Sequence, residues 1–125
     1  MWTLAKKFTF EASHQLPKHD GKCARLHGHS WAGYVICSSS ILKSNDSPKA
    51  GMITDYSDIS KMIDPLVEEK LDHYHLNEST GLDNPTSEEL ARWIYERIVS
   101  HRPMGVTLEA IVIEETCTSR CEDRP

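Results

Sequence analysis

The sequence predicts an α+β domain in which an antiparallel sheet carries two helices on one face. Three observations indicate this class: apolar and polar residues alternate near both ends of the chain, the middle has apolar residues at helical spacing, and the chain has 125 residues. That length suits one core and is too short for two ordinary domains, so residues 1–125 are interpreted as a single domain. The expected element order is β-β-α-α-β-β.

The first two strands are expected at residues 3–13 and 29–42. Phe8 and Phe10 alternate with polar residues in the first segment, and the second is rich in aromatic and β-branched residues. Turn-forming residues at 43–51 follow the second strand and end the pair.

Two helices are expected in the middle of the chain. Asp55 is an N-cap residue for the first helix, and Pro65 is expected to bend or shorten it. The segment from Thr86 to Glu89 matches a capping box at the start of the second helix. The positions expected to face the core are Ile59, Met62, Ile63, Leu66 and Val67 in the first helix and Leu90, Trp93, Ile94 and Ile98 in the second.

Two further strands are expected after the helices. Residues 106–115 alternate again and the remaining residues are few and polar, which predicts a third strand and a stunted fourth. A four-stranded sheet of this kind leaves two edges unpaired and one face uncovered. Copies joined edge to edge into a closed ring would cover them, so we expect an oligomer with sites near its subunit boundaries.

Composition narrows the classes of partner. The formal net charge of −5 and the lack of a Lys/Arg-rich run argue against direct binding of nucleic acid. No segment approaches the roughly 20 consecutive apolar residues that cross a bilayer, so no membrane association is expected. We expect a soluble, cytoplasmic protein whose four cysteines are free thiols.

Three histidines form the one constellation that folding alone would not require. His27 and His29 are two apart on an extended segment, so their side chains point to the same side of a sheet. His14, at the end of the first alternating run, would supply a third nitrogen from a neighbouring strand. Three protein nitrogens leave a tetrahedral Zn²⁺ ion with one open position, which is typical of a catalytic site.

Cys23 precedes His27 by four residues and has two readings. As a fourth ligand it would close the zinc site and make it structural, whereas apart from the metal it would act as a base or nucleophile. We favour the second reading because Lys22 and Arg25 flank the thiol, and positive charge favours a thiolate. The same two residues are candidates for binding a negatively charged part of a substrate.

Two carboxylates complete the set of candidate site residues. Asp72 adjoins His73, and a carboxylate beside an imidazole can fix its tautomer and give a proton carrier near neutral pH. Glu115 ends the third strand, where a carboxylate can hold a ring with adjacent N–H donors by two parallel hydrogen bonds. Its neighbour Glu114 should face the other way.

In this order along the chain, these motifs resemble the 6-carboxytetrahydropterin synthases of the 6-pyruvoyltetrahydropterin synthase superfamily. The resemblance covers nearly the whole chain and is carried by Phe10–His14, Cys23–His29, Leu71–His73, Asn84–Glu88 and Glu115–Thr118. It implies the tunnelling fold (T-fold), in which subunits close into barrels and assemble as homohexamers, dimers of trimers, with active sites at subunit interfaces.

The resemblance also implies roles for individual residues. His14, His27 and His29 would hold zinc, and Cys23 would be the proton-transfer thiol. A relay of Asp72 with His73 would assist it, Glu115 would grip the pterin ring, and Thr86 and Ser87 would add contacts to the ring. The implied reaction converts 7,8-dihydroneopterin triphosphate to 6-carboxy-5,6,7,8-tetrahydropterin, acetaldehyde and triphosphate, on the route to 7-deazaguanines such as queuosine.

Spacing distinguishes the close relatives. Three residues separate Cys23 from His27 in this chain, whereas the pyruvoyl-forming enzymes resemble a pattern with five, and a third group has glutamate in place of the thiol. The spacing therefore favours the carboxy-forming reaction. A pyruvoyl-forming enzyme and a small non-enzymatic zinc module stay as alternatives.

Overall fold

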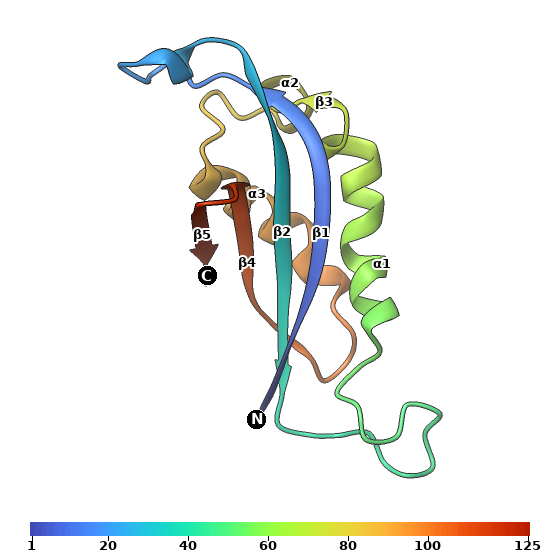
Figure 1. The fold of residues 1–125 in the computed structure, drawn as a ribbon. Coiled ribbons are helices and arrows are strands. Elements are labelled where there is room, and N and C mark those ends of the chain that lie inside the picture. Colours follow the sequence, from blue (N-terminus) through green and yellow to red (C-terminus); the bar gives the residue numbers. More distant parts are fainter.

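A computed structural model describes residues 1–125 and contains two layers, a curved sheet and a layer of helices (Figure 1). The sheet has the order β3-β1-β2-β4-β5, and only β3 runs parallel to its neighbour. The strands are β1 (Trp2–His14), β2 (His27–Ser39), β3 (Tyr74–His75), β4 (Thr107–Thr116) and β5 (Ser119–Asp123).

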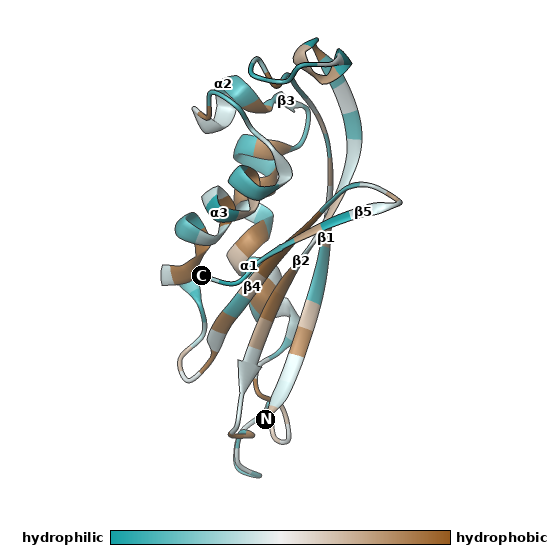
Figure 2. Ribbon diagram, turned by 90° about the vertical axis from the view of Figure 1, so that its left-hand side faces the viewer, coloured by the Kyte–Doolittle hydropathy of each residue, from teal (hydrophilic) through white to brown (hydrophobic).

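The helices lie on one face of the sheet, as the view from the side shows (Figure 2). They are α1 (Tyr56–Leu66), which runs into a π-helical turn (Val67–Leu71), the short α2 (Leu76–Thr80), and α3 (Ser87–Ile98), which ends in a 3-10 turn (Val99–His101). A further 3-10 turn at Lys22–Ala24 lies in the loop between β1 and β2. No helix has the length and apolar character that crossing a bilayer requires.

The expected fold class is confirmed, but the number of strands is not. Four strands were expected, and the structure has five because β3 pairs with β1 through Ala12 and Ser13. A strand of two residues has no alternation that a sequence could reveal. The second strand also begins at His27, two residues earlier than expected, and α2 follows β3 directly.

The two long helices begin at the expected caps. The carboxylate of Asp55 accepts a hydrogen bond from the Ser57 N–H at 2.9 Å, and α1 ends at Leu66, one residue after Pro65. The hydroxyl of Thr86 accepts from the Glu89 N–H at 3.2 Å. In a full capping box the side chain of Glu89 would accept from the Thr86 N–H. Here the Thr86 N–H instead donates to the carbonyl of Asn84.

The core lies between the sheet and the helices and leads directly to the histidines. Phe8, Phe10 and Trp31 stack in a row along this face of the sheet, with ring centroids 6.2 and 5.7 Å apart. Trp31 in turn meets the edges of His14 and His29, at 5.0 and 5.3 Å. The residues of α1 and α3 that complete this core include Ile59, Met62, Ile63, Leu90, Trp93, Ile94 and Ile98. The histidines therefore form the polar end of an aromatic core.

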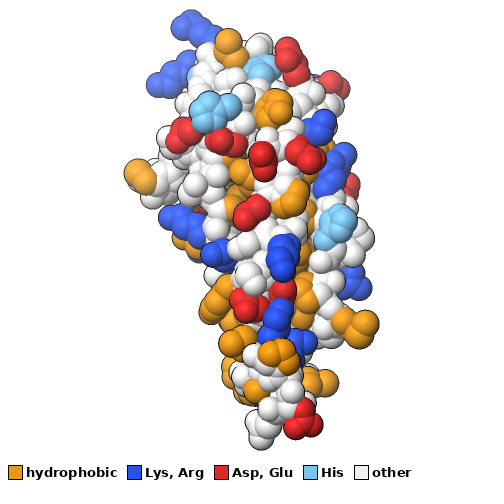
Figure 3. All heavy atoms as spheres, turned by 90° about the vertical axis from the view of Figure 1, so that its right-hand side faces the viewer, with side chains coloured by type: hydrophobic (Ala, Val, Ile, Leu, Met, Phe, Trp, Pro, Cys, Tyr) orange, Lys and Arg blue, Asp and Glu red, His pale blue; other side chains and the backbone are white.

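The outward side of the molecule near α1 carries intermingled acidic and basic side chains (Figure 3). No contiguous basic surface appears on this face, in agreement with the low content of Lys and Arg relative to Asp and Glu.

Replacing Gly33 with alanine is expected to destabilise the fold. A Cβ at Gly33 would lie 2.7 Å from the carbonyl oxygen of Val112 and 2.8 Å from Cε1 of Phe8, so backbone or ring must shift. Overpacking of this kind costs about 1–3 kcal/mol of unfolding free energy. Gly28→Ala is the matched control on the same strand, because its nearest neighbour would lie at 3.6 Å. Denaturant unfolding of both variants checks this, and equal stabilities would contradict it.

Candidate metal site

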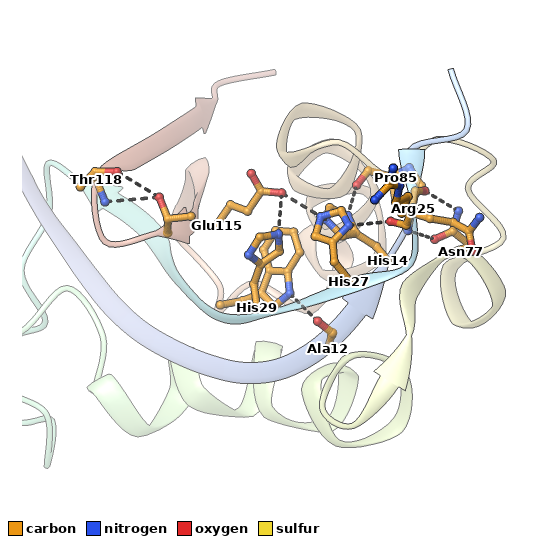
Figure 4. Close-up of polar contacts among 12 residues, drawn as sticks. Ala12, His14, Arg25, His27, His29, Asn77, Pro85, Glu115 and Thr118 are labelled. Atoms are coloured by element: carbon orange, nitrogen blue, oxygen red, sulfur yellow. Dashed lines mark hydrogen bonds and ion pairs between the residues drawn. The ribbon is translucent and has the colours of Figure 1, made fainter. Parts of the chain in front are cut away.

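The pairing of β1 with β2 brings the three histidines together. His14 lies opposite His27 and Ala12 lies opposite His29, so all three imidazoles share the face of the sheet that carries Phe8, Phe10 and Trp31. Figure 4 shows the three rings converging. His14 is completely buried, and His27 and His29 are half-buried. The three residues come from two strands but share one end of the core.

Glu115 of β4 joins the histidines. Its Oε1 lies 3.2 Å from Nε2 of His14 and 3.4 Å from Nε2 of His29, and Nε2 of His14 lies 3.0 Å from Nε2 of His27. The four potential ligand atoms all lie within 4.8 Å of one another. This arrangement could hold one metal ion.

Backbone carbonyls fix the orientation of two of the rings. Nδ1 of His14 donates to the carbonyl of Pro85 at 3.0 Å, and Nδ1 of His27 donates to the carbonyl of Arg25 at 2.7 Å. Because a carbonyl can only accept, each Nδ1 carries the proton and a neutral ring has its lone pair on Nε2. Two lone pairs 3.0 Å apart cannot form a hydrogen bond with each other, so a cation between them would relieve their repulsion.

His29 supplies further evidence that these residues fit a metal. Its Nε2 is buried and makes no hydrogen bond within the protein, and its polar neighbour there is Oε1 of Glu115 at 3.4 Å. Buried nitrogens normally make a hydrogen bond, so one that makes none at a convergence of imidazoles and a carboxylate fits a ligand position. Three imidazole nitrogens and one carboxylate oxygen are a donor set that suits zinc.

Burial favours the neutral form of two of the imidazoles, those of His14 and His29. It is the largest cause that lowers the pKa of His14 and of His29 below 6.5, and it outweighs the carboxylate of Glu115, which favours the charged form of both. A neutral imidazole has the lone pair that a metal requires. The lowered pKa of His14 and His29 thus favours the form that can bind a metal.

Cys23 lies beside this group rather than within it. The thiol belongs to the 3-10 turn between β1 and β2 and lines a cavity of about 320 Å³ together with Lys22, Arg25, His27 and His29. It is not one of the four residues whose ligand atoms converge. The thiol is thus outside the group of side chains that could hold a metal ion, and in a cavity that two of them line.

Asp72 and His73 are held against the edge of β1. The Glu11 N–H donates to Oδ1 of Asp72 at 2.9 Å, and the His73 N–H donates to the carbonyl of Glu11 at 2.6 Å. His73 has φ of 64°, a left-handed conformation that is uncommon for residues other than glycine and that clusters at functional sites. Its Nδ1 lies 2.9 Å from Oδ2 of Asp72, and its side chain is 79% exposed.

The Asp72–His73 pair is separated from Cys23 within one chain. His73 lines a second cavity, of about 510 Å³, with Glu11, Ser13 and Ser30. Glu11 and Ser13 alternate with Ala12 and His14 along β1, so this cavity opens on the face opposite the metal group. Only His29 lines both cavities.

The remaining expected substrate contacts also lie outside the histidine cavity. Thr86 lines a third cavity, of about 330 Å³, with Lys18, Asn84 and Glu89, and its hydroxyl caps α3. Ser87 is the first residue of α3. Within one chain, neither residue joins the histidines.

Glu115 is not among the metal ligands expected from the sequence, although it joins the three histidines in the group that could hold an ion. Its alternation with Ile111 and Ile113, which face the core, is the sequence signal that could have revealed it. The carbonyls of Arg25 and Pro85 left no such signal, because any residue type supplies a backbone carbonyl.

Comparisons with known proteins agree on one family. The family model described as 6-pyruvoyl tetrahydropterin synthase matches residues 3–125. The chain is 49% identical to a 6-carboxy-5,6,7,8-tetrahydropterin synthase of Synechocystis sp. over 119 residues, which is 95% of this chain and 90% of the relative. It is 34% identical to a dihydroneopterin monophosphate aldolase of Pyrococcus furiosus, over 86% of this chain and 83% of that protein. The structure of Caenorhabditis elegans 6-pyruvoyl tetrahydropterin synthase is similar, with a TM-score of 0.77 at 24% identity, over 99% of this chain and 95% of that one.

The unfolding free energy of the metal-free protein is expected to decrease as the pH falls below 6.5. Burial lowers the pKa of His14 and His29 in the folded state, whereas histidines of the unfolded chain titrate near 6.5. Below that pH the unfolded chain binds protons that the folded chain does not, and the loss continues until the pH passes the lowered values.

Denaturant unfolding over this pH range measures the effect. His14→Gln should reduce the pH dependence, and His101→Gln, at an exposed histidine outside the site, is the matched control. A pH dependence that His14→Gln leaves unchanged would contradict the expectation.

Proposed function

The chain belongs to the 6-pyruvoyl tetrahydropterin synthase family, and we propose that it is a zinc-dependent lyase with a pterin substrate. The proposed reaction converts 7,8-dihydroneopterin triphosphate and water to 6-carboxy-5,6,7,8-tetrahydropterin, acetaldehyde and triphosphate, an early step toward 7-deazaguanines such as queuosine. The observation that carries the proposal is the convergence of His14, His27, His29 and Glu115. The identity to the Synechocystis synthase supports this particular reaction.

His14, His27 and His29 would hold the zinc ion through their Nε2 atoms, which the carbonyl contacts of His14 and His27 support. Bound there, zinc would supply Lewis acidity to the hydroxyl groups of the substrate side chain. The carboxylate of Glu115 would anchor the pterin ring by accepting two parallel hydrogen bonds from adjacent N–H groups. Glu115 is half-buried beside the histidines, which supports this role. The pterin ring and the side chain that it carries belong to one substrate molecule, so their binding groups must lie close together.

Cys23 would move protons on and off the carbons of the substrate side chain. The thiol shares a cavity with His27 and His29, so a side chain held at the histidines lies within reach of it. Lys22 and Arg25 line the same cavity and would contact the triphosphate, where their positive charge complements the phosphate oxygens.

His73 would exchange protons with Cys23. Nδ1 of His73 faces the carboxylate of Asp72, which fixes the tautomer and leaves Nε2 to accept or release a proton. Since the two residues line cavities on opposite faces within one chain, the relay needs His73 from a neighbouring copy.

The edge of β1 supports such an assembly. β1 pairs with β3 only at Ala12 and Ser13, so most of its outer edge has no strand partner, and β5 forms the other edge of the sheet. Edge-to-edge closure would cover both. We propose a homohexamer, a dimer of trimers, with Thr86 and Ser87 contacting the pterin ring at subunit boundaries.

The purified, zinc-loaded protein is expected to release acetaldehyde and a carboxylated pterin from 7,8-dihydroneopterin triphosphate. Chromatography and mass spectrometry of the products check this. A pyruvoyl product would instead support the pyruvoyl-forming reaction, for which the matching family model is named. Turnover of dihydroneopterin monophosphate alone would favour the aldolase reaction named for the Pyrococcus relative. No turnover of any of these pterins would refute the proposal.

Cys23→Ala is expected to lower turnover about a hundredfold or more, the usual contribution of a proton-transfer group, without releasing zinc. Metal analysis and steady-state kinetics on the same preparation separate the two effects. Cys117→Ala is the matched control, because Cys117 is exposed in the turn after β4. Loss of zinc from the Cys23 variant would mean that the thiol is a ligand and that the site is structural.

Mixing the Cys23→Ala and His73→Ala variants tests the relay between copies. After dissociation and reassembly together, a fraction of the sites would combine an intact thiol with an intact His73, so activity should reappear. Sedimentation provides the control, with six times the chain mass of 14.2 kDa expected before and after mixing. A sedimenting mass of one chain, or no recovery in a reassembled hexamer, would contradict the proposal.

A further inference from the structure

The side-chain amide of Asn77 is bonded to two separate backbone segments that flank His14. Its Oδ1 accepts from the Gln15 N–H at 3.0 Å, and its Nδ2 donates to the Gln15 carbonyl at 2.8 Å (Figure 4). Nδ2 also donates to the Asp83 carbonyl at 3.3 Å. The three bonds involve both the oxygen and the nitrogen of the side-chain amide. Because the N–H of Gln15 needs an acceptor and its carbonyl needs a donor, these two bonds determine which atom of the amide is Oδ1 and which is Nδ2.

The first of these segments immediately follows His14. β3 pairs with β1 at Ala12 and Ser13 and then ends, so the backbone of Gln15 has no strand neighbour on that side. The Asn77 amide takes the place of the missing strand residue by bonding both the N–H and the carbonyl of Gln15. This fixes the end of β1 at the residue after a metal-ligand candidate.

The second segment carries the group that orients the His14 ring. Asp83 lies two residues before Pro85, whose carbonyl accepts from Nδ1 of His14 at 3.0 Å. Asn77 therefore connects the end of β1, which bears His14, with the loop whose Pro85 carbonyl accepts from Nδ1 of His14. The amide itself is positioned by α2, whose Leu76 is fully buried in the core.

We propose that Asn77 is a positioning residue of the metal site, which sets the Nε2 of His14 for zinc without touching the ion. The proposal rests on the zinc-binding part of the proposed function. It predicts that Asn77→Ala lowers zinc affinity by up to about tenfold, because tenfold is the lower end of what loss of a direct contact to a metal-ligating histidine costs and Asn77 reaches His14 only through the backbone of Gln15 and Asp83. The loss of zinc affinity should arise only from the altered position of His14.

Zinc affinity of the purified protein, measured by competition with a chromogenic chelator, tests this without reference to turnover. Asn84→Ala is the matched control, because Asn84 is in the same loop region and its side chain makes one long contact, at 3.4 Å, to the Lys18 N–H. The control should bind zinc as the unchanged protein does. Equal affinities of the Asn77→Ala variant and the unchanged protein would overturn the proposal.

A double-variant cycle separates positioning from a general loss of structure. If Asn77 acts through His14, adding Asn77→Ala to His14→Ala lowers zinc affinity no further, whereas independent effects would add. Additive losses would overturn the proposal. The electronic spectrum of bound Co²⁺ gives a second readout, since the Asn77→Ala spectrum should shift toward that of His14→Ala.

Asn77→Asp covers the case in which the alanine variant does not fold. The aspartate keeps the acceptor for the Gln15 N–H and loses both donated bonds, so zinc affinity should fall below that of the unchanged protein. Measurement at about 0.5 M salt reduces the effect of the added charge, because the screening length is then only a few ångströms. Unchanged or tighter zinc binding would overturn the proposal. Failure of the unchanged protein to bind zinc would instead refute the proposed function.

Discussion

The register of β1 against β2 determines which groups meet at the end of the core. With His14 opposite His27, the core face of β1 presents Phe8, Phe10 and His14 in sequence, and that of β2 presents His27 and His29 beyond Trp31. A shift of one strand by one residue would turn its side chains to the opposite face from those of the other strand. The same register thus places the aromatic row inside the core and the imidazoles at its polar end, so packing and chemistry depend on one alignment.

The imidazoles that could hold a metal are oriented by groups outside the candidate donor set. Backbone carbonyls of Pro85 and Arg25 take the Nδ1 protons, and burial keeps His14 in its neutral form. Glu115 opposes the effect of burial but supplies the one negative charge beside the site. A divalent cation would then meet oriented lone pairs and a single carboxylate, which limits the reorganisation that binding requires.

Sequence patterns could predict the parts of this site that depend on local periodicity. The spacing of His27 and His29 requires only an extended strand, and the caps at Asp55 and Thr86 require only local hydrogen bonds. The carbonyl contact from Pro85 to His14 spans 71 residues, and no residue type identifies a carbonyl in advance.

The segment of β3 and α2 shows the same limit. Two strand residues and five helical residues are too short for a periodic signal, and their positions are fixed by contacts with β1. Asn77, which bonds the backbone after His14, belongs to this segment and could not be recognised from spacing. The separation of Cys23 from His73 likewise follows from which face of the sheet each residue occupies.

X-ray absorption at the zinc edge of the substrate-free protein tests the central claim most directly. Three imidazole nitrogens at about 2.0–2.1 Å and one oxygen neighbour at about 2.0–2.2 Å are expected, the oxygen from water in the open position, because Glu115 is assigned to the pterin ring. A sulfur neighbour at about 2.3 Å would contradict the account, because Cys23 would then close the site and could not transfer protons beside an accessible metal.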